Sequence, residues 1–179
     1  MNRYQTPLEV VIKGAIAGIA GAAVLGYLMQ KSMEMMQQKQ PAPQQEQPST
    51  DPKEVLVEKV STSIFETELP EEQRKSLAQT VHWVYGAFWG TVYAVVQSSF
   101  SLPLLVHGIF FGTFVWAFGP LLALPRMKLS PPPEAQPPEQ LGMWAGLHVA
   151  YGLSTAITFA LLSHIGLPGR REDREEPED

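Results

Sequence analysis

Long stretches without charge alternate with short polar segments along this chain. No Asp, Glu, Lys or Arg occurs in residues 14–30, 76–125 and 140–169, and the charges gather in the segments between them and after them. A membrane-spanning helix needs about 20 predominantly apolar residues. The longest uncharged stretch has room for two crossings. The pattern therefore predicts an all-α, polytopic membrane protein with four transmembrane helices.

Helix-capping and proline signals place the boundaries of these elements. Thr6, Pro7 and Glu9 form a capping-box sequence that opens the first helix. Prolines between the later spans interrupt helices and favour connections. The predicted units are a first transmembrane helix with a polar extension (1–36), an extramembrane linker with an amphipathic helix (37–75), the second and third transmembrane helices (76–125), a Pro-rich loop (126–140), the fourth transmembrane helix (141–166) and a charged, disordered tail (167–179).

A second capping signal lies inside the linker. Asp51 and Glu54 repeat the cap spacing, and Val57, Val60 and Ile64 follow as one apolar stripe. This pattern predicts a short amphipathic helix at the membrane surface. The alternative is a solvated helix that packs on the linker itself.

Each predicted span carries small residues four positions apart. Such ridges let helix backbones approach closely where no water drives helices together. We therefore predict a Gly-rich, closely packed bundle, and we expect the first ridge, or the face beside it, to meet another chain. The ridge glycines are Gly14, Gly18, Gly26, Gly86, Gly90, Gly108, Gly112, Gly142 and Gly146.

The second and fourth spans share the motif His-x-x-Tyr-Gly. It reads "HWVYG" at 82–86 and "HVAYG" at 148–152, and both motifs continue into similar apolar sequence. The match suggests two repeated helical hairpins in the same orientation. His82 and His148 then lie near one membrane face, and His107 and His164 lie towards the other.

Three interpretations of these histidines stay open. The favoured one is structural, with hydrogen bonds across to neighbouring helices. The second is a His-lined path for protons or a substrate. The third is a cofactor site in which His82 and His148, and with less support His107 and His164, bind haem b as axial ligands. We predict no cofactor and no metal site.

Composition removes several classes of function. With 13 basic and 18 acidic residues the net charge is −5, whereas nucleic-acid binding needs clustered basic residues. The absence of cysteine excludes disulfides and thiolate chemistry. No catalytic triad, phosphate loop or zinc-protease motif occurs, so we predict that the protein is not an enzyme and has no catalytic residues.

The order of these features resembles the YagU-like family of small bacterial inner-membrane proteins. The motifs that carry the resemblance are "TVHWVYGAFWG", "FVWAFGPLLALP" and "GLHVAYGLS", within residues 8–165. The resemblance implies a multi-pass protein of the bacterial inner membrane. This chain has Trp116 at a position of the third span where the family pattern suggests a histidine.

These observations favour a non-enzymatic integral membrane protein that packs against other membrane chains. It would act as a homo-oligomer or as an accessory subunit of a larger complex, with lipids, other membrane proteins or itself as partners. One alternative is a small transporter or channel with a His-lined path. The other is an electron carrier that binds haem b through paired histidines.

Overall fold

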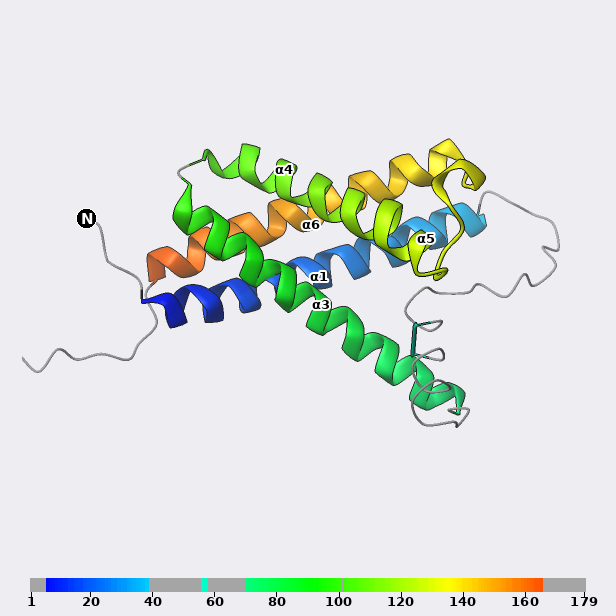
Figure 1. The fold of residues 1–179 in the computed structure, drawn as a ribbon, viewed down its shortest axis with the longest axis horizontal. Coiled ribbons are helices and arrows are strands. Elements are labelled where there is room, and N and C mark those ends of the chain that lie inside the picture. Colours follow the sequence, from blue (N-terminus) through cyan, green and yellow to red (C-terminus); the bar gives the residue numbers. More distant parts are fainter. Residues whose placement is uncertain (1–5, 39–55, 58–69, 101, 166–179) are drawn as a thin grey trace, which may run out of the picture.

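The computed structural model describes residues 6–38, 56–57, 70–100 and 102–165. Within this part of the chain, all regular secondary structure is helical (Figure 1). The elements are the α-helices α1 (Pro7–Gln38), α3 (Glu71–Ser99), α4 (Leu104–Trp116), α5 (Leu124–Arg126) and α6 (Pro138–Ile165), the π-helical segment η1 (Ala117–Ala123) and the 3-10 turn η2 (Pro133–Ala135).

Among the described residues, three helical segments are long and apolar enough to cross a membrane, where four were predicted for the chain. They are Pro7–Met35, Leu104–Arg126 and Pro138–His164. The expected second span is the continuous helix α3, but its hydropathy is lower. Its first turns are charged, and the uncharged remainder includes His, Trp, Tyr and Gln side chains. Absence of charge therefore identified a helix there, but it overstated how apolar that helix is.

The capping box at the start of α1 is confirmed. The backbone N–H of Glu9 donates to Thr6 Oγ1 (3.3 Å), and the N–H of Thr6 donates to Glu9 Oε2 (3.0 Å). The second capping signal, at Asp51, lies outside the described residues. Of the predicted amphipathic helix only Leu56 and Val57 are described, and both are helical.

The third predicted span contains a proline, Pro120, that does not end the helix. Pro120 lies inside the π-helical segment η1, between α4 and α5. Proline has no N–H to donate and clashes with the preceding turn, and a π-bulge accommodates both effects. The helical path therefore continues to Arg126, after which Lys128 adopts a left-handed conformation (φ 57°).

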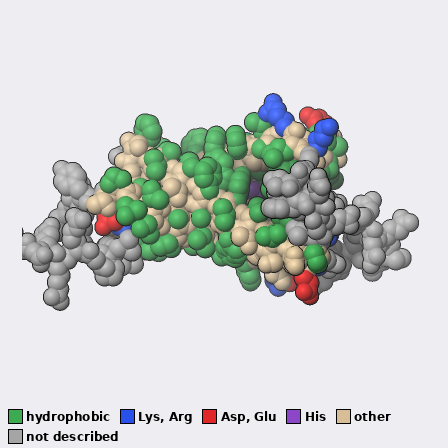
Figure 2. Space-filling view, turned by 60° about the horizontal axis from the view of Figure 1, so that its bottom comes forward, with side chains coloured by type: hydrophobic (Ala, Val, Ile, Leu, Met, Phe, Trp, Pro, Cys, Tyr) green, Lys and Arg blue, Asp and Glu red, His purple; other side chains and the backbone are tan. Residues whose placement is uncertain are grey.

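The helices form two antiparallel pairs that pack on each other. α1 pairs with α3, α4 pairs with α6, and α1 also packs along α6. Figure 1 shows α1, α4 and α6 running alongside one another, while α3 crosses them and its N-terminal half points away from the bundle. On the face in Figure 2, hydrophobic side chains cover most of the body and charged side chains gather at its ends. An exterior of this kind suits lipid contact.

Candidate functional site

The α1–α3 crossing brings backbone against backbone. A Cβ atom placed on Gly18 would lie 2.1 Å from the carbonyl oxygen of Gly86 and 2.7 Å from Gly90 Cα. A Cβ atom on Gly90 would lie 2.3 Å from the carbonyl oxygen of Gly14. Real Cβ atoms do not approach other atoms so closely, so only glycine fits at these positions. The ridge that we expected to meet another chain, or to lie beside a face that does, thus packs within this chain.

The α4–α6 crossing has the same construction. A Cβ atom on Gly112 would lie 2.2 Å from the carbonyl oxygen of His148, and one on Gly152 would lie 2.2 Å from that of Gly108. Gly152 was not among the predicted ridge residues. Its place in the second His-x-x-Tyr-Gly motif, equivalent to Gly86 in the first, is the signal that identifies it.

Three other predicted ridge glycines are not in tight contact. A Cβ atom on Gly26 would lie 3.8 Å from His82 Nε2, which is ordinary van der Waals distance. Around Gly142 and Gly146 a Cβ atom would meet nothing within 4 Å, and both residues are exposed. The N-terminal half of α6 therefore presents an open strip of small residues on the outside of the described bundle.

The tyrosine of the second motif joins the two helix pairs. Tyr151, buried on α6, donates its hydroxyl to the carbonyl oxygen of Gly86 on α3 (3.0 Å). Tyr93 on α3 packs edge-on against Phe159 on α6 (5.9 Å between ring centroids). Since residue numbers rise together along these two contacts, α3 and α6 run in the same direction. His82 and His148 therefore lie towards the same end of the bundle.

His82 and His148 make different hydrogen bonds. The Nε2 atom of His82 lies 3.1 Å from the carbonyl oxygen of Ala22 on α1. A carbonyl oxygen accepts, so this nitrogen carries the proton and offers no lone pair to a metal. His148 instead donates from Nδ1 to the carbonyl oxygen of Trp144 on its own helix (2.8 Å). The geometry of His82 supports the structural interpretation and disfavours a haem bound through its Nε2.

The other two histidines lie towards the opposite end. His107 is buried, pairs through Nδ1 with the side-chain oxygen of Gln97 and lies against the ring of Tyr93 (4.7 Å between centroids). His164 is exposed, and its Nδ1 donates to the carbonyl oxygen of Ala160 (2.7 Å). In the described ranges no group of three or more His, Asp or Glu side chains could hold a metal ion.

Over the part of the chain that the structure describes, the fold and these crossings define an all-helical protein with three candidate membrane spans and glycine-mediated helix contacts. The chain matches the family described as "Protein of unknown function (DUF1440)" over residues 29–157. This match covers more than half of the chain, which therefore belongs to that family. No curated protein and no solved structure gives a significant match.

Proposed function

We propose that this protein is a non-enzymatic membrane subunit that packs against other membrane chains. It acts as a homo-oligomer or as an accessory component of a larger complex. The observation that carries the proposal is the open strip at Gly142 and Gly146, around which a Cβ atom would have no neighbour within 4 Å. Glycines at this spacing in a membrane helix favour close approach of another helix.

The contacts of the other glycine ridges support the choice of the α6 strip as the partner surface. Gly14, Gly18, Gly86 and Gly90 are occupied by the α1–α3 crossing, and Gly112 by the α4–α6 crossing. Their ability to admit a neighbouring backbone is already used inside the chain. The strip on α6 has the same spacing and remains open, so it is the surface that we assign to a partner helix.

Substitutions on this strip test the proposal. Gly142→Ile together with Gly146→Ile should remove the high-mass complex seen by native electrophoresis of mildly solubilised membranes, because the bulk holds the partner helix away. The monomer should still fold, since a Cβ atom at either site would meet no described neighbour within 4 Å. Val84→Phe together with Val95→Phe, at two exposed positions of α3, adds the same number of carbon atoms elsewhere and should leave the complex intact. A monomer-sized wild-type species in native membranes contradicts the proposal.

We further propose that α3 crosses the membrane with the other three helices, as two repeated hairpins of a YagU-like protein in the bacterial inner membrane. The support is its uncharged run from Ser76, its glycine crossing with α1 and its bond from Tyr151. The equivalent positions of Gly86 and Gly152 support the repeat.

The lack of cysteine makes the topology of α3 directly measurable. Single cysteines at Glu72 and Ser99, both exposed near the two ends of α3, should react with a membrane-impermeant thiol reagent from opposite sides of the membrane. Labelling of both cysteines from one side would show that α3 does not cross.

A further inference from the structure

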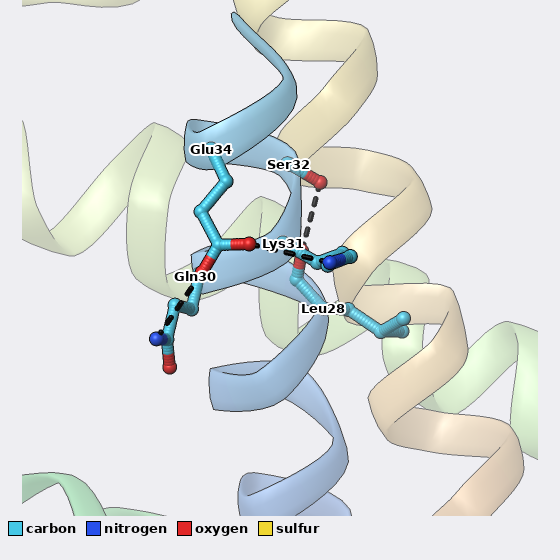
Figure 3. A network of polar contacts seen from close by, with 5 residues as sticks. All are labelled: Leu28, Gln30, Lys31, Ser32 and Glu34. Carbon is cyan, nitrogen blue, oxygen red and sulfur yellow. Dashed lines mark hydrogen bonds and ion pairs between the residues drawn. The ribbon is translucent and has the colours of Figure 1, made fainter. Parts of the chain in front are cut away.

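Two lysines of α1 have opposite environments. Lys31 is exposed (57 % of its side chain) and pairs with Glu34, whose carboxylate also accepts from Gln30 (Figure 3). Lys13 is only 2 % exposed, and among the described residues it makes no hydrogen bond or ion pair. Since burying an ammonium group without a counter-charge is costly, Lys13 calls for an anionic partner that the bundle itself does not supply.

The position of Lys13 along α1 indicates where that partner comes from. Lys13 and Lys31 bracket the uncharged run 14–30, and at ~1.5 Å per residue their Cα atoms lie about 27 Å apart. This separation is close to the ~30 Å thickness of a hydrocarbon core. Side chains on a helix tilt towards its N-terminus, so the Lys13 stem leads outwards to the depth of the lipid headgroups.

The tip of Lys13 is the part that reaches the surface. Its amine makes no hydrogen bond with the described residues and is not completely covered, so part of the small remaining exposure lies on the ammonium group. The buried stem holds this end in place. The site is therefore open to a group that arrives from the membrane interface.

Two polar side chains lie near the level of Lys13 along the bundle. Glu9, one turn earlier on α1, has a carboxylate that already accepts the N–H of Thr6 in the capping box. On α6, Ser163 has a buried Oγ without a hydrogen-bond partner. Gly21 of α1 lies against α6 near residues 151 and 155, and the two helices are antiparallel, so Lys13 and Ser163 lie at about the same level.

We propose that Lys13 binds a phosphate oxygen of an anionic phospholipid headgroup, with the Ser163 hydroxyl as a second donor. The chemistry required is an anionic oxygen at the membrane boundary, which such headgroups supply in quantity. The site is distinct from the strip at Gly142 and Gly146. It rests on α1 spanning the membrane and not on the partner proposed for α6.

Thermal unfolding of the purified full-length protein tests the site, with tryptophan fluorescence as the readout. Micelles doped with phosphatidylglycerol should raise the unfolding temperature by roughly 3–6 °C over phosphatidylcholine with the same acyl chains, as expected for a ligand well above its Kd. Lys13→Gln should abolish this difference. Lys31→Gln, at the paired lysine, should retain it.

Three results would overturn the assignment. The first is an equal phosphatidylglycerol effect in wild type and Lys13→Gln. The second is inorganic phosphate alone reproducing the whole shift, which would assign the site to free phosphate. The third is Glu9→Gln removing the effect as fully as Lys13→Gln, which would make Lys13 one half of an intrahelical ion pair. Lys13→Gln should leave the complex formed through α6 unchanged, so each proposal fails separately.

Discussion

The substitution Gly18→Ala is the strongest test of the helix packing in the bundle. The added Cβ would lie 2.1 Å from the carbonyl oxygen of Gly86, 2.7 Å from Gly90 Cα and 2.9 Å from the carbonyl carbon of Gly86. All three atoms belong to backbone, so no side chain can rotate away. Since ordinary contacts begin near 3.4 Å, α1 and α3 must separate by about 1 Å along much of their crossing.

The size of the effect follows from two opposing terms. Overpacking a well-filled core costs about 1–3 kcal/mol, and a backbone clash belongs at the upper end. Replacing glycine by alanine also stabilises the helix by up to about 1 kcal/mol, because alanine has the higher helix propensity. We therefore expect Gly18→Ala to lower the free energy of unfolding by about 2 kcal/mol, a change of about thirtyfold in the unfolding equilibrium.

Unfolding in mixed micelles with increasing denaturing detergent measures this change, because tryptophan fluorescence reports on Trp89 in the core. Gly26→Ala and Gly146→Ala are matched controls, since their Cβ atoms would meet ordinary contact or open space. Both should be as stable as wild type or more stable. If Gly18→Ala unfolds at the same detergent fraction as Gly146→Ala, the α1–α3 crossing is not as described.

Further predictions concern the motif side chains. Tyr151→Phe removes the bond to the Gly86 carbonyl and should cost about 0.6–1.7 kcal/mol in the same unfolding assay; no loss would show that the bond is not formed in the membrane. His82→Phe loses the bond to Ala22 and should cost a similar amount, whereas the exposed His164→Phe should have little effect; equal losses would refute the structural role of His82. Protein purified from a native membrane should show no Soret band before or after reduction; such a band would instead favour His148, whose Nε2 is not used in its bond to Trp144.

The sequence predicted local structure correctly where a residue type has one well-defined physical role. Thr6 and Glu9 form the predicted reciprocal cap because their side chains fit the orphan N–H groups of a helix start. Uncharged runs located the long helices. The helix α3, however, has a lower hydropathy than the other three segments even though most of it is uncharged. The reason is that its aromatic, His and Gln side chains are only partly apolar.

Other features depend on tertiary packing and could not be read from spacing. Gly18 and Gly146 share the same local pattern, yet one meets backbone and the other meets nothing within 4 Å. Likewise Lys13 and Lys31 both border the first uncharged run, but only Lys13 is covered by the bundle. Which neighbour a side chain meets depends on the pairing of helices far apart in sequence.

Crosslinking from the open strip of α6 in native membranes tests the central proposal most directly. A photoreactive thiol reagent would be attached to Gly146→Cys in this otherwise cysteine-free chain, with Phe110→Cys (Phe110 is 69 % exposed on α4) as the control. We predict a discrete protein adduct, either to a second copy or to one other membrane chain, from position 146 and only lipid adducts from position 110. Only lipid adducts from both positions would contradict the proposal that α6 packs against another chain.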